Sequence, residues 1–381
     1  MTSIDWAALS DWRAREAHTL GPWAMHSAES AGRVHPEPPH PFRAPYQRDR
    51  DRIVHSAAFR RLAHKTQVFT GVRDDYHRSR LTHTLEVTSI ARTLARALAL
   101  NEDLVETLAL GHDIGHPPLG HAGEDTLAEL LAHEGGFNHN AQAMRIMELL
   151  ESRDSRFPGL NLSREVLDAQ ATRKRDGKAP APLLETQAVD AADSIAYDTH
   201  DADDAIELGL VTLEEMLGLP LVAEAAARVR DHVGGVAGHD LRRAVLHELV
   251  DLQVADLVAE SRTTIERLGI DSVDRVRAVF DGVDGRRSVR VISHSATLAA
   301  GKKQLEIFLF QRVYRSDRVM SVRAVAQQRL SDLFQWYVAH PDDLPARYRA
   351  RAADCGVPRS TADYIAGMTD RFLEWDHGRR L

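Results

Sequence analysis

From residue 48 onward, apolar residues recur at intervals of three and four, and this spacing most limits the fold of the 381-residue chain. Leu81, Leu85, Leu94 and Leu98 follow the pattern that gives a helix one apolar face. The alternation typical of strands is scarce, and we expect a strand only over residues 288–292. The sequence therefore predicts an all-α, multi-helix fold.

Boundaries between helices follow from capping residues and from Pro/Gly-rich segments. Asn101 is predicted to cap a helix that continues to about residue 111, because Glu102 and Asp103 follow it in the first turn. Residues 21–45 and 174–182 predict loops. Other expected helices lie within 1–20 and over 126–131, 138–151, 183–209 and 223–233.

Three parts are expected along the chain. Residues 1–45 would form an N-terminal helix and a Pro-rich arm, residues 46–215 a catalytic core, and residues 216–381 a C-terminal helical region. The 48 basic and 56 acidic residues leave a net charge of −8, which argues against a general nucleic-acid binder. The single cysteine, the absence of a signal-peptide pattern and the lack of a long apolar run favour a soluble cytoplasmic protein without a membrane span.

Residues 111–124, with the sequence GHDIGHPPLGHAGE, form the most informative stretch. Imidazole and carboxylate groups at this density are typical of a site for a divalent ion, and no thiolate is available for a structural zinc knuckle. The neighbours His112 and Asp113 can share one ion if they lie at a helix end over a cleft. Two further ligands are available in His83, expected on the polar side of its helix, and Asp193, in a helical stripe of carboxylates.

The arrangement of these residues resembles the HD superfamily of metal-dependent phosphohydrolases, and within it the deoxynucleoside triphosphate triphosphohydrolase branch. The resemblance extends from about residue 45 to residue 373. Its motifs are RDRDRI at 48–53, FRRL at 59–62, HKTQVF at 64–69, RLTHTLEV at 80–87, the 112–124 run, FNHN at 137–140, DSIAY at 193–197, FLF at 308–310 with VY at 313–314, and DYIAGMTDR at 363–371.

The resemblance implies roles for particular residues. The implied metal ligands are His83, His112, Asp113 and Asp193. The positions that match catalytic and phosphate-contacting residues are His116, His121, Glu124 and His139. Because His121 and Glu124 are three residues apart and would share a face on a helix, we interpret them as a proton-transfer pair.

Substrate contacts are expected on both sides of the metal. Arg80 is the best candidate near the α-phosphate, since it lies one turn before His83. The resemblance implies that Tyr197 packs against the deoxyribose, with Asp201 one turn later as an acceptor for the 3′-hydroxyl. A later basic group could reach the triphosphate or a regulatory nucleotide; its members are Lys302, Lys303, Arg312 and Arg315.

The expected activity is hydrolysis of deoxynucleoside triphosphates to a deoxynucleoside and inorganic triphosphate. Two alternatives stay open: hydrolysis of a 5′-monophosphate or cyclic nucleotide, and a nucleotide- or nucleic-acid-binding regulator with weak turnover. The expected cofactor is a divalent metal, magnesium or manganese first, with iron, cobalt, nickel or zinc as alternatives. Expected partners are deoxynucleoside triphosphates, further copies of the chain, and a single-stranded nucleic acid or regulatory nucleotide.

Overall fold

The computed structural model describes residues 11–67, 78–174, 180–233, 237–281 and 289–381. Within these ranges every regular element is a helix, and β pairing is limited to isolated bridges, which confirms the all-α prediction. The expected strand is wrong for residues 289–292, while Ser288 lies outside the described ranges. The reason is that the N–H groups of Val291 and Ile292 bond the Gln187 side chain, at 2.9 and 3.2 Å, instead of a neighbouring strand.

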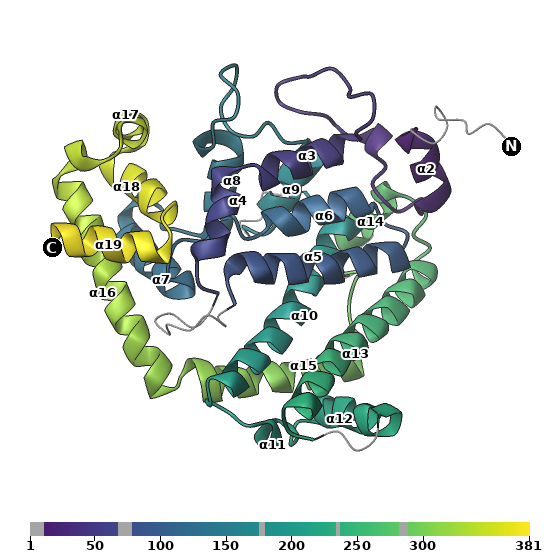
Figure 1. Ribbon diagram of the computed structural model, residues 1–381. Helices are drawn as coiled ribbons and strands as arrows, with labels where there is room; N and C mark the ends of the chain where they lie inside the picture. The colour runs from purple at the N-terminus through teal and green to yellow at the C-terminus, as the bar shows by residue number, and fades with distance from the viewer. Residues whose placement is uncertain (1–10, 68–77, 175–179, 234–236, 282–288) are drawn as a thin grey trace, which may run out of the picture.

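The first hydrophobic cluster forms the middle of the molecule, where α5 and α6 cross α10 (Figure 1). It includes Val87, Leu104 and Ile195, all fully buried. The described helices of this part, with α2 at its edge, are α2 Trp12–Thr19, α3 Pro45–Val54, α4 Ala57–Arg61, α5 Arg80–Ala97, α6 Glu102–Gly111, α8 His139–Arg145, α9 Arg164–Thr172, α10 Leu184–Glu207 and α14 Val273–Phe280.

The second hydrophobic cluster lies at the far end of α10, where Ala202 and Ala205 pack with Leu249 and Leu305. Its helices are α11 Leu213–Met216, α12 Pro220–Val233, α13 Gly238–Arg267, α15 Ala296–Leu309 and the π-helix η5 Phe310–Tyr314. Short helical turns elsewhere are η1 Ser27–Glu29, η2 Leu62–His64, η3 Ala132–Glu134, η4 Ile146–Leu150 and η6 Pro341–Asp343. The helix α10 passes from the first cluster into the second. The domain boundary expected at residue 215 stays a prediction.

The third hydrophobic cluster joins α7 to the C-terminal helices (Figure 1). Leu127 and Leu131 of the earlier helix pack here with Leu330 and Leu373. The helices concerned are α7 Gly120–Leu130, α16 Asp317–Ala339, α17 Ala346–Cys355, α18 Val357–Ala366 and α19 Asp370–Arg380. The helix α7, which begins inside the histidine-rich run, is therefore supported mainly by the C-terminal region.

The start of α6 follows the predicted capping rule, whereas the predicted buried face of α5 is wrong in part. Asn101 caps α6 as predicted, with its side chain accepting from the Leu104 N–H. In α5, however, Leu85 is 51% exposed, whereas His83 is buried. The buried stripe runs through His83, Val87 and Leu94, because α5 turns this side towards α6 and α10. The sequence interpretation failed because it excluded a histidine from the buried face.

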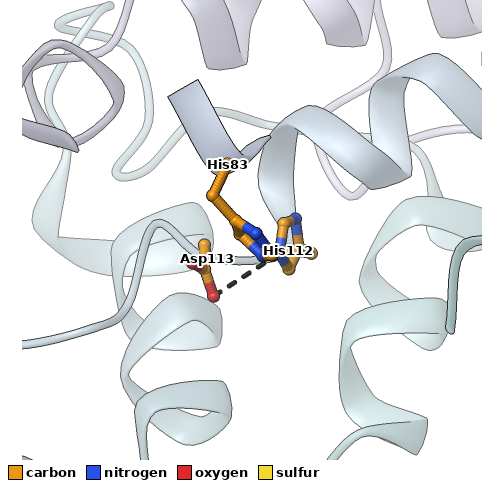
Figure 2. Close-up of side chains that lie close together, drawn as sticks. All are labelled: His83, His112 and Asp113. Carbon is orange, nitrogen blue, oxygen red and sulfur yellow. Dashed lines mark ion pairs between the residues drawn. The ribbon is translucent and has the colours of Figure 1, made fainter. Parts of the chain in front are cut away.

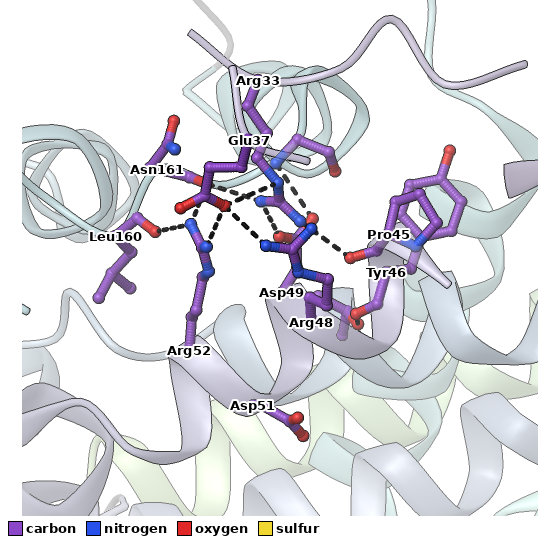
Figure 3. A network of polar contacts seen from close by, with 12 residues as sticks. Arg33, Glu37, Pro45, Tyr46, Arg48, Asp49, Asp51, Arg52, Leu160 and Asn161 are labelled. Atoms are coloured by element: carbon purple, nitrogen blue, oxygen red, sulfur yellow. Dashed lines mark hydrogen bonds and ion pairs between the residues drawn. The ribbon is translucent and has the colours of Figure 1, made fainter. Parts of the chain in front are cut away.

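The Pro-rich arm is held to the core by a network of buried charges (Figure 3). Arg33 pairs with Asp49, whose side chain is fully buried, and also donates to the Asn161 carbonyl at 2.6 Å. Arg52 donates to the same carbonyl at 2.7 Å and pairs with Glu37 of the arm. The irregular arm thus gains a defined position without forming a long helix.

We predict that Asp49→Ala lowers stability by about 3–5 kcal/mol, because it leaves the buried Arg33 with only Glu37, 3.8 Å away, as an anionic partner. Thermal or urea unfolding measures the change. The matched control is Asp154→Ala, which breaks the exposed pair with Arg156 and is expected to change stability little. Equal effects of the two substitutions would contradict a stabilising role for the network.

Candidate active site

A cavity of about 1370 Å³ opens where the three hydrophobic clusters meet. Its wall includes residues of α5, α7, α8, α10, α15 and α16, together with the turn between α6 and α7. A volume of this size accommodates a nucleotide-sized ligand with its solvent. The cavity contains most of the residues that the sequence singled out.

His83, His112 and Asp113 point towards one another at the base of this cavity (Figure 2). One ligand atom from each lies within 4.8 Å of the others. The α6 helix ends at Gly111, and so His112 caps it while Asp113 begins the following turn. This ending allows two successive side chains to converge, as the sequence predicted for a helix end.

Asp193 completes the group from α10. Its Oδ1 atom lies 3.1 Å from the Nε2 atom of His83 and 3.6 Å from that of His112. The four residues that the sequence proposed as metal ligands are therefore brought together from three helices. The Asp193 side chain is 39% exposed, on the side that faces the cavity.

Electrostatics leave His112, Asp113 and Asp193 in the protonation states that a cation requires, whereas they favour the protonated form of His83. Burial lowers the pKa of His112, which keeps its ring neutral. Burial opposes ionisation of Asp113 and Asp193, but neighbouring histidines, with Arg80 beside Asp113, lower the pKa of both carboxyls. For His83, the hydrogen bond and charge of Asp193 outweigh burial and raise the pKa.

The donor set fits a divalent metal ion. The Nδ1 atom of His112 lies 2.6 Å from the Ala109 carbonyl, which assigns the ring proton to Nδ1. Its buried Nε2 atom has no hydrogen-bond partner among the described residues and faces the Asp113 and Asp193 carboxylates. A lone pair placed in this way is suited to coordinate a cation.

A second group lies beside the first. The Nε2 atom of His116 is 3.1 Å from Asp113, and its ring stacks on that of His139 with centroids 3.8 Å apart. His139 contacts Glu124 through its Nδ1 atom at 2.8 Å and its backbone N–H at 2.9 Å. His121 lies 3.7 Å from Glu124, which is beyond a direct hydrogen bond. The expected His121–Glu124 contact is thus present at ion-pair distance, beside a closer Glu124–His139 pair.

Arg80 lines the cavity but is almost fully buried, with its Nη1 atom 2.8 Å from Asp113. Its guanidinium therefore supports a candidate metal ligand, and its remaining surface faces the cavity. Tyr197 also lines the cavity, one turn after Asp193, with its ring centroid 6.1 Å from that of Tyr314. Both residues lie where the sequence interpretation placed substrate contacts.

Four expected substrate contacts do not line the cavity, and one of them, Arg312, pairs with Glu215 at the surface. Asp201 is buried and accepts a hydrogen bond from the Tyr314 hydroxyl. Lys302 turns inward to Asp198 and to the Ser194 carbonyl, the latter at 2.9 Å. Arg315 lies over the Phe310 ring, 5.1 Å from its centroid. Buried partners satisfy the polar groups of Asp201 and Lys302, whereas Arg315 is exposed outside the cavity.

Comparisons with known proteins agree with this geometry. A family model for the HD domain matches residues 80–198, and one for a phosphohydrolase-associated domain matches residues 292–379. A deoxyguanosinetriphosphate triphosphohydrolase-like protein from Azoarcus sp. (strain BH72) is 41% identical over 380 residues, covering 96% of this chain and 98% of the relative. A protein of the same name from Geobacter sulfurreducens is 40% identical over 380 residues, covering 97% and 96%.

The chain belongs to the deoxyguanosinetriphosphate triphosphohydrolase-like proteins. It is therefore a hydrolase with an HD domain and a metal-binding site, followed by the C-terminal region typical of this family. Among the helices described, none combines the length and apolar character needed to cross a bilayer.

Sequence reasoning missed the cations Arg173, Arg290 and Arg323 on the cavity wall of this family member, and did not distinguish Lys303 from Lys302. Arg173 and Arg290 both pair with Asp190, at 2.9 and 3.3 Å. Lys303, rather than its neighbour Lys302, faces the cavity, and Arg323 of α16 reaches it as well. Successive residues on a helix point roughly 100° apart, but no sequence signal indicated which lysine of α15 faces inward.

We predict that His112→Ala and Asp193→Ala each lower metal affinity by at least about 10-fold. Removal of a residue that only supports a metal ligand already costs about 10-fold, and loss of a ligand itself should cost at least as much. Metal content after dialysis, measured by plasma mass spectrometry, checks this. His133→Ala, on the exposed turn η3, is the control and keeps the wild-type content. Stoichiometric metal in Asp193→Ala would remove that residue from the ligand set.

Proposed function

We propose that the chain hydrolyses deoxynucleoside triphosphates to a deoxynucleoside and inorganic triphosphate. The observation that carries this proposal is that one cavity holds both the His/Asp cluster and a wall of cations: Arg173, Arg290, Lys303 and Arg323. A triphosphate requires such charge to hold it, since phosphoryl transfer depends on positioning and electrostatics. The name of the relatives, which refers to deoxyguanosine triphosphate, supports the same substrate class.

In this reaction a water oxygen forms a bond to the α-phosphorus, and the bond from that phosphorus to the 5′-oxygen breaks. The water loses a proton, and the 5′-oxygen gains one to become the hydroxyl of the deoxynucleoside. The proposed ligands are His83, His112, Asp113 and Asp193. The metal they would hold supplies a lowered pKa for water and polarises the phosphoryl group. Magnesium or manganese is our first proposal for its identity, because two carboxylates favour hard ions.

Arg80 and the cavity cations have separate tasks in this proposal. The buried guanidinium of Arg80 fixes Asp113 and presents positive charge near the α-phosphate. The β- and γ-phosphates would contact Arg173 and Arg290, which share Asp190 and are thereby held side by side on the wall. Arginine forks suit phosphate oxygens because they donate two parallel hydrogen bonds.

Glu124 and its histidines are proposed to move the proton. Burial disfavours the Glu124 carboxylate, but the nearby His121 and the hydrogen-bonded His139 lower its pKa, and so it stays ionised. Glu124 orients His139, while His121 is 53% exposed towards the cavity and is free to reach substrate. We assign to His121 the donation of a proton to the leaving 5′-oxygen.

The sugar is proposed to lie against Tyr197, one helical turn from Asp193. A ring at this place excludes a 2′-hydroxyl by contact, without requiring a hydrogen bond. Asp201, buried behind Tyr314, would act by holding that second ring rather than by binding the 3′-hydroxyl. Function in the cytoplasm and as a homo-oligomer belongs to the same proposal and has its support in the family alone.

Product analysis tests the proposal. We expect each active deoxynucleotide to yield deoxynucleoside and triphosphate, whereas orthophosphate release or opening of a cyclic nucleotide would indicate another substrate class. Binding of nucleotide without any product would indicate a regulator.

Tyr197→Ala is expected to raise kcat/KM for a ribonucleotide relative to the matching deoxynucleotide. Tyr197→Phe is expected to preserve the wild-type ratio, because the ring excludes the 2′-hydroxyl.

We also predict that Glu124→Gln and His121→Ala each lower kcat by about 10²–10⁴ while bound metal stays constant, since neither is a proposed ligand. Steady-state kinetics and metal analysis measure the two effects. Glu129→Gln, exposed on the same helix, is the control and keeps wild-type kcat. If His121 and Glu124 act as one unit, the double variant is little worse than the worse single variant; multiplicative losses would show independent action.

A further inference from the structure

The segment between α6 and α7, which we call the histidine turn (residues 112–120), has few bonds of its own: the His116 N–H donates to the Asp113 carbonyl at 3.1 Å, and the His116 ring contacts the Asp113 side chain. Leu119 has a left-handed backbone, with φ +67°, and Gly120 follows at φ +58°. Leucine rarely adopts this conformation, because its Cβ approaches the following carbonyl. The helix α7 also begins without a side-chain cap. Something outside the turn must therefore hold it in place.

Asp370, the first residue of α19, supplies part of that support. Its Oδ1 atom accepts a hydrogen bond from the Leu119 N–H at 2.8 Å. Its Oδ2 atom accepts one from the Thr66 N–H at 2.8 Å and another from the Thr66 hydroxyl. A single carboxylate thus takes the place of a cap on α7 and ties the histidine turn to the 62–67 segment.

Lys65 supplies the rest. Its side chain is buried, and its Nζ atom donates to the His116 carbonyl at 2.5 Å and to the Ala366 carbonyl at 2.8 Å. Ala366 ends α18, where carbonyl groups lack helical partners. The lysine therefore joins the middle of the histidine turn to the end of a C-terminal helix.

Apolar packing also holds α7 against the C-terminal region. Leu119 and Leu127 of the α7 region belong to the third hydrophobic cluster with Leu330 and Leu373. Gly123 lies so close to the Pro118 carbonyl that an added Cβ would come within 2.0 Å of it. The turn and α7 are thus a tightly packed unit with little room to adjust.

We propose that Asp370 and Lys65 are positioning residues, which hold the histidine turn so that His116 and His121 face the substrate. The reaction they serve is the one proposed above, and the inference rests on it in that respect. Neither side chain lines the cavity, and so neither is assigned a substrate contact. The C-terminal region is, on this view, a structural part of the active site.

Asp370→Asn tests the proposal, because an amide keeps the shape but has only one oxygen to accept from donors on both sides. We expect kcat to fall by about 10²-fold, the loss that a displacement near 1 Å can cause, with KM and bound metal close to wild type. Lys65→Gln is expected to act in the same direction. The matched control is Asp376→Asn, a buried carboxylate of α19 whose partners Tyr337, Arg379 and Arg380 all lie in the C-terminal region; it lowers stability but keeps kcat.

Hydrogen exchange gives a readout that does not depend on turnover. In Asp370→Asn, peptides covering residues 116–124 should take up deuterium faster, whereas Asp376→Asn leaves them as in wild type. If the wild-type protein released no triphosphate from any deoxynucleotide, the proposed function would fail while exchange still tested the support of the turn.

The proposal is overturned by unchanged exchange in the turn, by unchanged kcat in a folded Asp370→Asn protein, or by equal kcat losses in Asp370→Asn and Asp376→Asn. Should Asp370→Asn not fold, Thr66→Val removes only one of the three hydrogen bonds to Asp370. A smaller loss of kcat with faster exchange at 116–124 is then expected, and wild-type values of both would overturn the proposal.

Discussion

The site depends on where α6 ends. Because the helix stops at Gly111, His112 and Asp113 leave it in directions that converge, although they are neighbours in sequence. The Ala109 carbonyl at this helix end orients the imidazole, and the next turn carries His116 within reach of Asp113. A helix longer by one turn would separate the two side chains by about 100° and leave no common centre.

Burying this many charges is tolerable because these groups have a partner of opposite sign or, as for Lys65, hydrogen bonds to carbonyl groups. Arg80 contacts Asp113, Lys302 contacts Asp198, and the charges of the arm form their own network. An isolated ion in an apolar interior would cost far more than packing around it returns. The apolar clusters enclose these pairs and exclude water, which strengthens the field that acts on a bound polyphosphate.

The fold class and the group of candidate ligands could be predicted from sequence, because short sequence patterns indicate both. Helical spacing needs only near neighbours, and His112 with Asp113 is a contiguous signal. Other features depend on contacts between distant segments. The choice of Lys303 over Lys302 at the cavity, the contact of Glu124 with His139, and the use of Gln187 by residues 291 and 292 follow from how helices pack, and no local pattern reports this. His83 was placed on the wrong face because polarity was taken as a sign of exposure.

The bonds from Lys65 to Ala366 and from Thr66 to Asp370 span 301 and 304 positions of the sequence. During synthesis the N-terminal part of a chain emerges and begins to fold first. The histidine turn would then lack its outside support until residues 366–370 had left the ribosome. Contacts of such long range also close slowly. The active site would therefore be among the last parts of the protein to fold. A chain terminated before residue 366 would lack the support of the histidine turn and would be inactive.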